Sequence, residues 1–480
     1  MKAAGAAGGA VSLSGCRSFP RIGKRPNVVL VLTDQWRASA TGYAGDPNVE
    51  TPHLDALAAE GVNFRNAVSC CPVCSPARGS LITGQYPLKH GVFLNDVLLQ
   101  HKSLSIADVF NQAGYRTGYI GKWHLDGQGR STYIPPERRQ GFQYWKALEC
   151  SHNYNNSAYY ENDDPEIKYW DGYDVFAQTD DAINFMRTSG DQPFFLILSW
   201  GPPHDPYLTA PEEFMQRYDP ASMDLSPNVP EDEAAFMTRT QWEEKASTLA
   251  QTPALVAAGY YAHCTAMDRD IGRLRKAIRE SGLGDDTIFI FTSDHGDMLG
   301  SHGQWNKMQP YDESVRVPFL IEGPGVAGGT VETPINTPDI YPTLCGLCGI
   351  PVPDSVEGRN YTPELRSGNW SDEAALIANY HAFGQWSPAK GGKEWRGVRT
   401  ARHTYAEDLN GPWLLFDNER DPYQQDNLVN RPEFAALQVR LKAALQKKLH
   451  ATRDEFRPGM DYVRKWGYSV DETGTAKYSK

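Results

Sequence analysis

Three segments of this chain, 27–33, 193–199 and 286–292, each hold four or five apolar residues in a row. Strands that are apolar at every position are buried on both faces, which is typical of a parallel sheet covered by helices on each side. Segments with helical periodicity lie between them, the longest over about 255–280. The chain therefore predicts an α/β fold, in which a large, mixed but mostly parallel sheet is sandwiched by helices.

The pattern changes after about residue 370, where shorter strands are predicted. Residues 396–405 and 413–416 are predicted to form antiparallel strands, and an amphipathic helix is predicted to follow over 432–450. We therefore predict a large domain over 25–370 and a small C-terminal α+β subdomain over 371–480.

The charge of the chain limits its partners. The 480 residues carry a formal net charge of −12, which argues against nucleic acid or an anionic membrane surface as a partner. An anionic substrate would need a local basic pocket, because the overall field repels it. No run of about 18 apolar residues occurs, so no transmembrane helix is predicted. An acidic stretch over about 211–251 is poor in strand signals and is predicted to be an insertion.

The first residues differ from the rest in composition. Residues 3–15 are mainly Ala and Gly, and the tetrapeptide Leu-Ser-Gly-Cys that ends at Cys16 looks like a bacterial lipobox. This likeness implies an export signal over 1–24 and a lipid anchor at Cys16, and hence a periplasmic or cell-surface location in a bacterium. A simple Ala/Gly-rich tail is the alternative that the sequence leaves open.

The densest motif spans residues 72–84, Pro-Val-Cys-Ser-Pro-Ala-Arg-Gly-Ser-Leu-Ile-Thr-Gly. Cys74 is followed by Pro76 and then by Arg78, one helical turn further on. The run resembles the modification sequence of the sulfatase family, in which the Cys is oxidised to formylglycine. The hydrate of that aldehyde supplies a nucleophilic oxygen for attack on a sulfate ester. A buried structural Cys beside a proline turn is the alternative.

Polar residues also follow four of the predicted strands at their carboxyl ends. In open α/β sheets, ligands bind in the crevice outside these ends. We therefore expect one site to which several strands contribute. The residues in question are Asp34, Gln35, Lys122, His124, His204, Asp294 and His295.

Oxygen ligands among these residues indicate a divalent cation. Asp34, Gln35 and Asp294 offer hard oxygen atoms, which favour Ca²⁺ over Mg²⁺ and disfavour zinc. Such a cation would orient the nucleophile, lower its pKa and offset the charge of the sulfate. The resemblance to the sulfatase family adds Cys74 and His295 to the predicted metal ligands. A strand-end turn is the alternative for each acidic motif.

The resemblance also implies roles for the basic residues. The Gly-Lys-Trp-His run that ends at His124 resembles the second sulfatase motif, in which Lys122 would bind sulfate and His124 would be the base that triggers sulfate release. His204, after a Pro, resembles a His that binds sulfate and protonates the leaving alcohol. Lys307 matches a second sulfate-binding Lys, and Arg78 is expected to hold the diol or a sulfate oxygen.

Two positions depart from the usual sulfatase pattern. The family often has Asp at the position of Gln35, and many members have Asn at the position of His295. Both residues keep a coordinating atom. His295 resembles the arrangement in related phosphonate and phosphate ester hydrolases.

The leading hypothesis is a Ca²⁺-dependent formylglycine sulfatase of the alkaline-phosphatase-like superfamily, which acts on a sulfated carbohydrate and is matured by a formylglycine-generating enzyme. A phosphonate monoester or phosphodiester hydrolase on the same fold is one alternative, and a non-catalytic glycan-binding lipoprotein is another. The polar segment 149–156 is a candidate pocket wall. Four tryptophans are candidates for sugar stacking, although a core position is the commoner fate of Trp. They are Trp200, Trp305, Trp386 and Trp395.

Overall fold

The structure, a computed structural model, describes residues 25–231, 252–371 and 373–478. The predicted export segment over 1–24 lies outside the described residues, and so does the part of the predicted insertion over 232–251.

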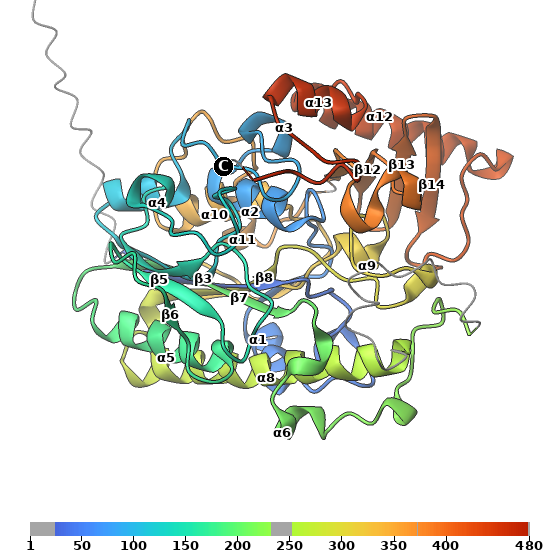
Figure 1. Ribbon diagram of the computed structural model, residues 1–480. Helices are drawn as coiled ribbons and strands as arrows, with labels where there is room; N and C mark the ends of the chain where they lie inside the picture. The colour runs from blue at the N-terminus through green and yellow to red at the C-terminus, as the bar shows by residue number, and fades with distance from the viewer. Residues whose placement is uncertain (1–24, 232–251, 372, 479–480) are drawn as a thin grey trace, which may run out of the picture.

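A ten-stranded sheet forms the centre of the molecule, in the order β10-β2-β9-β8-β1-β7-β3-β4-β5-β6 (Figure 1). The five central strands from β8 to β4 are parallel, whereas β9 and β5 pair antiparallel with the strands beside them. The predicted fold class is confirmed. The strands are β1 (Asn27–Asp34), β2 (Val62–Phe64), β3 (Arg116–Lys122), β4 (Tyr144–Leu148), β5 (Ala158–Glu161), β6 (Lys168–Tyr169), β7 (Phe194–Pro203), β8 (Thr287–Ser293), β9 (Phe319–Glu322) and β10 (Gly329–Val331).

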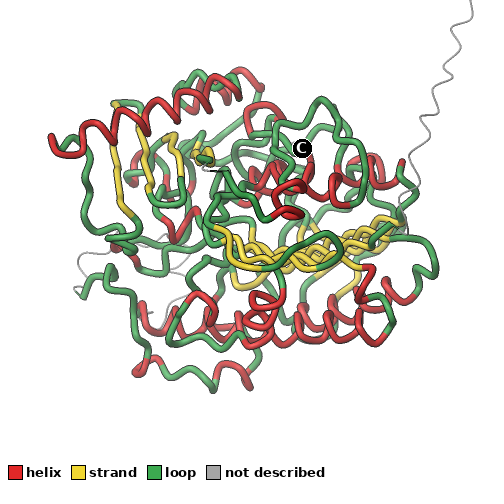
Figure 2. The backbone as a smooth tube through the Cα atoms, turned by 180° about the vertical axis from the view of Figure 1, so that it is seen from behind, coloured by secondary structure: helices red, strands yellow, loops and turns green. Residues whose placement is uncertain are grey.

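Helices cover both faces of this sheet, which Figure 2 shows edge-on between two helical layers. Consecutive residues of β1 enter different cores: Val28 and Leu30 belong to one hydrophobic cluster, Val29 and Val31 to the other. This explains why the strand is apolar at every position. The helices of one layer are α1 (Pro52–Glu60), α5 (Asp174–Arg187), α6 (Glu212–Met215) and α8 (Pro253–Glu280). Those of the other are α2 (Cys74–Thr83), α3 (Pro87–His90), α4 (Ile106–Gln112), α10 (Thr337–Leu347) and α11 (Thr362–Ser367).

A four-stranded antiparallel sheet lies beside the main body, in the order β11-β12-β13-β14. It falls within the segment predicted to be a subdomain. The predicted single strand over 396–405 is wrong, because a turn divides it into β12 and β13. The Thr400 hydroxyl accepts the N–H of His403 at 2.8 Å and closes that turn. The elements are β11 (Ala375–Asn379), β12 (Trp395–Arg399), β13 (His403–Asp408), β14 (Gly411–Asp417), α12 (Ala435–Ala451) and α13 (Gly459–Trp466).

The short helix α9 (Asp312–Val315) joins the two sheets through an ion pair. Asp312 accepts two hydrogen bonds from Arg399 of β12, both at 3.0 Å. None of the described helices is both long enough and apolar enough to cross a membrane.

Candidate active site

The ends of four neighbouring strands bring the polar residues together. β8, β1, β7 and β3 are adjacent and parallel, so their carboxyl ends lie at one edge of the sheet. Asp34 and Lys122 end β1 and β3, whereas His204 and Asp294 follow β7 and β8 directly. All four residues are buried. Residues that are far apart in the sequence thus form one cluster.

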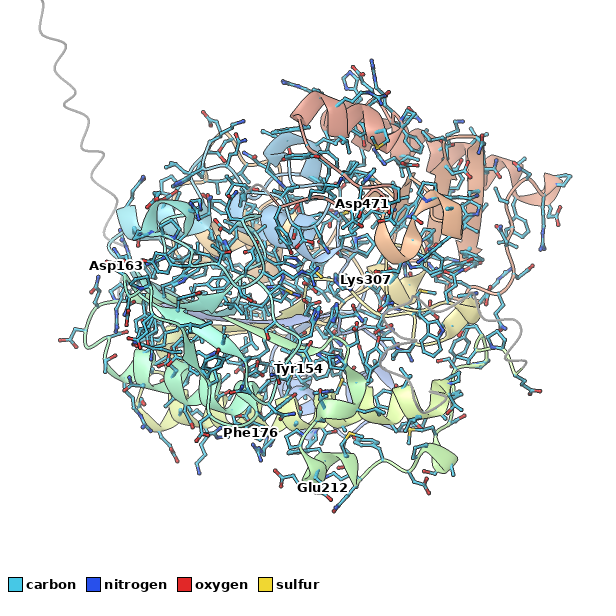
Figure 3. All side chains as sticks on the ribbon, in the orientation of Figure 1. Tyr154, Asp163, Phe176, Glu212, Lys307 and Asp471 are labelled. Atoms are coloured by element: carbon cyan, nitrogen blue, oxygen red, sulfur yellow. The ribbon has the colours of Figure 1, made fainter. Side chains whose placement is uncertain are left out.

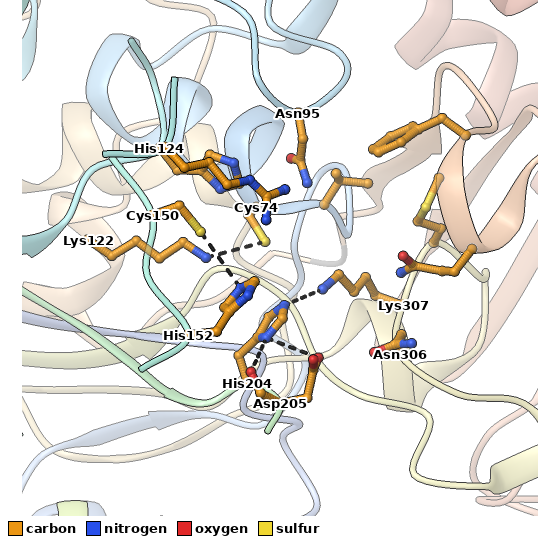
Figure 4. Close-up of a pocket in the computed structure, with 15 residues that line it drawn as sticks. Cys74, Asn95, Lys122, His124, Cys150, His152, His204, Asp205, Asn306 and Lys307 are labelled. Carbon is orange, nitrogen blue, oxygen red and sulfur yellow. Dashed lines mark hydrogen bonds and ion pairs between the residues drawn. The ribbon is translucent and has the colours of Figure 1, made fainter. Parts of the chain in front are cut away.

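Cys74 lies in this cluster as the first residue of α2. Its Sγ atom is 3.2 Å from Nε2 of His295, 3.6 Å from Oδ1 of Asp34 and 4.0 Å from Nζ of Lys122 (Figure 4). Burial raises the pKa of the Cys74 thiol, but Lys122, Lys307 and His295 outweigh burial and hold that pKa well below its ordinary value. The surroundings of position 74 therefore stabilise negative charge.

Arg78 links α2 to the acidic strand ends. Its Nε and Nη2 atoms lie 3.0 and 2.9 Å from Oδ2 of Asp294, and Nη2 is 3.4 Å from Oδ2 of Asp34. Nη1 donates to the carbonyl oxygen of Lys122 at 2.9 Å and to the Ser199 hydroxyl at 2.7 Å. The guanidinium thus offsets both carboxylates and fixes Cys74, one turn earlier, beside them.

Four buried residues offer ligand atoms for a metal ion. Atoms of Asp34, Cys74, Asp294 and His295 all lie within 4.8 Å of one another. Nδ1 of His295 donates to the carbonyl oxygen of Gly296 at 2.9 Å, which directs the Nε2 lone pair into the cluster. Burial raises the pKa of the Asp294 carboxyl, and the negative charge of Asp34 raises it further. A bound cation would offset the repulsion between these two carboxylates. The residues therefore fit a divalent cation.

Gln35 lies next to the cluster, but its side chain is engaged elsewhere. Oε1 accepts a hydrogen bond from Nζ of Lys307 at 2.5 Å, and Nε2 donates to Oδ2 of Asp297 at 2.7 Å. The backbone N–H of Gln35 donates to Oδ1 of Asp294 at 3.1 Å. Oε1 of Gln35 has a second lone pair, so a cation bound there would share this oxygen with Lys307.

A cavity of about 190 Å³ opens over Cys74. It lies between the strand ends and the segment between β11 and β12 that carries Phe383 and Gln385, and Figure 3 shows Lys307 at this boundary. Basic side chains dominate its wall, and Asp205 is the one acidic residue among the described residues that line it. This is the local basic pocket that an anionic substrate of an acidic chain requires. The lining residues are Val73, Cys74, Asn95, Lys122, His124, Arg130, Cys150, His152, His204, Asp205, Asn306, Lys307, Met308, Phe383 and Gln385.

His124 enters the pocket two residues after the end of β3. Its Nε2 atom lies 3.0 Å from Oδ1 of Asp96, and its carbonyl oxygen accepts the Ser75 hydroxyl at 2.7 Å. Nδ1 is buried without a hydrogen-bond partner in the described part of the chain. Burial lowers the pKa of His124, but Cys150 and Asp96 raise it, to about 10 overall. With an unmodified Cys74, these surroundings therefore favour the protonated imidazole.

Lys307 and His204 form the opposite wall. Nζ of Lys307 donates to Nε2 of His204 at 2.8 Å, and Nδ1 of His204 lies 3.0 Å from Oδ1 of Asp205. The ring of His152 stacks on that of His204, with centroids 4.8 Å apart. These contacts hold Lys307 and His204, the two candidates for sulfate binding on this wall, in fixed positions.

Comparison with known proteins identifies the chain. A profile of the sulfatase family matches residues 26–350, which is more than half of the sequence. The chain belongs to the sulfatase family. It is therefore a sulfuric ester hydrolase. A second profile, described as N-sulphoglucosamine sulphohydrolase, C-terminal, matches residues 300–451 of this sulfatase.

Individual relatives agree with this assignment. The sulfatase is 48% identical to an ulvan-active sulfatase of Formosa agariphila, over 92% of this chain and 85% of that relative. The structure of a putative sulfatase from Bacteroides fragilis matches with a TM-score of 0.80 and 29% identity, over 94% of this chain and all of that one. A phosphonate monoester hydrolase of Agrobacterium radiobacter matches with a TM-score of 0.71 and 25% identity. The match covers 95% of this chain and all of that one.

Several residues of the sulfatase pocket were not predicted from the sequence. Asn95 and Arg130 lie on loops, and Phe383 and Gln385 come from the segment between β11 and β12, so no strand-end rule applies to them. The segment 149–156 was predicted as a pocket wall, and the structure confirms this for Cys150 and His152.

The four candidate tryptophans are not sugar platforms in this sulfatase. All four are buried, and none of them is among the described residues that line the pocket. Trp395, for example, donates its indole N–H to the carbonyl oxygen of Met308 at 2.9 Å. The structure therefore places all four tryptophans in the core.

Proposed function

We propose that this sulfatase hydrolyses sulfate monoesters of a sulfated glycan, with formylglycine formed from Cys74 as the source of the nucleophile. The observation that carries the proposal is the place of Cys74, at the floor of a basic pocket and 3.2 Å from His295. The glycan is supported by the relative described as an ulvan-active sulfatase.

Basic side chains in the walls of the pocket would offset the negative charge of the sulfate. The ammonium groups of Lys122 and Lys307 face Cys74 from two sides and would hold the sulfuryl oxygens. Oδ1 of Asp205 lies 3.0 Å from Nδ1 of His204 and holds that ring in place at the pocket wall. His204 would give a proton to the sugar oxygen that leaves when the S–O bond breaks, so that the sugar departs as the alcohol.

On the other wall, His124 would exchange a proton with the hydroxyl groups at position 74. Asp96 holds Nε2 of its ring at 3.0 Å, which leaves Nδ1 as the atom that faces the reaction. The hydrate of formylglycine, when present, supplies the attacking hydroxyl. Arg78 keeps position 74 beside the two carboxylates throughout.

A divalent cation, which we propose to be Ca²⁺, would be held by Asp34, Asp294, His295 and the oxygen that replaces Sγ at position 74. When bound, it lowers the pKa of the attacking hydroxyl and offsets sulfate charge. Gln35 is a further candidate ligand through the second lone pair of Oε1, which also accepts a hydrogen bond from Lys307.

Phosphonate monoester or phosphodiester hydrolysis is the second candidate activity. It is favoured by His295 in the ligand cluster and by the likeness to the phosphonate monoester hydrolase. Relative kcat/KM values on an aryl sulfate and a matched aryl phosphonate would separate the two. We expect the sulfate to be preferred, and a preference for the phosphonate would contradict the proposal.

The decisive experiment is mass spectrometry of the tryptic peptide 66–78 from protein made in a host with a formylglycine-generating enzyme. Conversion of the Cys74 thiol to the aldehyde lowers the mass by roughly 18 Da. An unmodified thiol, together with no hydrolysis of aryl sulfate, would contradict the proposal and favour a glycan-binding protein.

We further propose that the protein is exported and anchored by a lipid at Cys16, which lies outside the described residues. Metabolic labelling with a fatty acid would test this, because labelling should disappear in Cys16→Ala.

A further inference from the structure

Arg130 is a cation of the pocket that the chemistry at Cys74 does not use. It lies on the loop between β3 and β4, and its side chain is 46% exposed. Lys122 and Lys307, in contrast, are almost fully buried beside the nucleophile position. Arg130 therefore lines the open part of the same pocket, where the rest of a substrate would lie.

The guanidinium of Arg130 is held in place by two side chains from distant parts of the chain. Nε donates to the hydroxyl of Tyr478 at 2.9 Å, and Nη2 lies 3.3 Å from Oδ2 of Asp96. The Tyr478 hydroxyl in turn donates to Oδ1 of Asp96 at 2.9 Å. Nη1 makes no hydrogen bond within the described residues. Arg130 is thus fixed with one donor nitrogen left for a ligand.

The charge around Arg130 also favours an anion. Asp96 is shared with His124 as well as Arg130, so one carboxylate faces two basic side chains. Asp205, the one acidic residue among the described lining residues, lies against His204 instead. The Arg130 end of the pocket therefore has an excess of positive charge, although the chain as a whole carries −12.

We propose that Arg130 forms a second anion subsite, which recognises a carboxylate or a further sulfate on the sulfated sugar or on the sugar next to it. The proposal rests on the sulfatase activity proposed above and narrows its substrate to glycans with two anionic groups. An arginine suits this role because its planar fork matches carboxylate and sulfate oxygens. Gln385, from the C-terminal subdomain, lines the same cavity and offers hydrogen bonds to sugar hydroxyls.

The test compares four substrates with the modified enzyme. One is 4-nitrophenyl sulfate, which has no second anion. The others are a sulfated disaccharide with a neighbouring uronate, the same disaccharide with its carboxyl reduced to the alcohol, and this reduced disaccharide with a second sulfate. The variants are Arg130→Gln and Arg130→Lys. Arg217→Gln is the control, because Arg217 is 47% exposed, pairs with Glu50 and lies outside the pocket lining.

We expect Arg130→Gln to lower kcat/KM about tenfold to a hundredfold on the substrates with two anions, mainly by raising KM. The loss on 4-nitrophenyl sulfate and on the reduced disaccharide, which reports only the effect of Arg130 through Asp96 and Tyr478, should be about tenfold smaller. Arg130→Lys should restore part of the loss, and Arg217→Gln should match the wild type. Comparison of the loss on the uronate disaccharide with the loss on the reduced disaccharide that carries a second sulfate shows which anion Arg130 recognises.

Two results would overturn the proposal. An equal loss on all four substrates would mean that Arg130 acts through Asp96 and His124 as a positioning residue. No loss on any substrate would mean that Arg130 binds nothing. Failure of the proposed function is distinguishable from both, because the wild type would then not hydrolyse 4-nitrophenyl sulfate at all.

Discussion

The Nε2 atom of His124 lies 3.0 Å from the Oδ1 atom of Asp96, and both residues are buried. A carboxylate at this distance fixes the proton on Nε2 and leaves Nδ1 to face the pocket. Asp96 also accepts the hydroxyl of Tyr478, so the C-terminal end of the described chain supports the orientation of His124, the histidine for which we propose a catalytic role.

Asp96→Asn should therefore lower kcat more than it changes KM. The amide can accept the same hydrogen bond but no longer stabilises the positive imidazole, and it can also present its NH₂ group and reverse the tautomer. We expect a loss in kcat of about a hundredfold, the lower end of the range for general acid–base catalysis. Steady-state kinetics on 4-nitrophenyl sulfate measure this.

Asp96→Glu serves as the conservative variant and should recover part of the activity. A loss confined to KM would show that Asp96 acts on substrate binding instead. Thermal melting of both variants checks that the fold is intact.

Removal of the divalent cation should lower stability as well as activity. Asp34 and Asp294 are both buried in the ligand cluster, and a cation that binds only the folded state contributes about 2.7 kcal/mol at a hundredfold excess over its Kd. We expect a chelator to lower Tm and Ca²⁺ to restore it, with Mg²⁺ less effective.

In Asp294→Asn, Ca²⁺ should raise Tm much less, and the metal content measured by mass spectrometry should fall. An unchanged metal content would remove Asp294 from the ligand set.

Cys74→Ala should abolish turnover and leave the melting temperature of the chelator-treated protein nearly unchanged. The change removes the group that becomes the nucleophile, whereas it removes only one sulfur atom from the packing of α2. Differential scanning calorimetry and aryl sulfate hydrolysis measure the two effects. A large fall in Tm would favour a structural role for Cys74.

The strand ends of the site were predictable from the sequence because a local pattern fixes them. Asp34 and Asp294 end or follow strands whose apolar runs are visible in the sequence, and parallel strands align their carboxyl ends. Asp96 and Tyr478 were not predictable, because a loop and a terminal segment reach the site only through tertiary packing.

The same distinction holds for the fold. The central strands carry their own burial signal, whereas the turn between β12 and β13 has no Gly or Asn and is closed by the Thr400 side chain. Turn signals based on Gly and Asn therefore miss it, and one strand was predicted where the structure has two.

The ion pair between Asp312 and Arg399 should make the attachment of the C-terminal sheet dependent on pH. Burial raises the pKa of the Asp312 carboxyl, but Arg399 and Arg316 outweigh burial and hold that pKa below its ordinary value. The pair therefore contributes stability that is present above the unfolded value of about 4 and is lost as pH falls through the folded value. Asp312→Asn should cost about 3–5 kcal/mol at pH 7, because it leaves a buried Arg399 without its carboxylate.

Below about pH 4, the difference in the free energy of unfolding between Asp312→Asn and the wild type should shrink, because the wild type loses the same interaction there. Urea denaturation of both proteins at several pH values measures this difference in the free energy of unfolding. Asp461→Asn is the matched control, since Asp461 pairs with Arg464 at the surface and an exposed pair contributes little. A destabilisation by Asp312→Asn that does not change between pH 7 and pH 3 would show that shape and hydrogen bonding, rather than the charge of Asp312, hold the two sheets together.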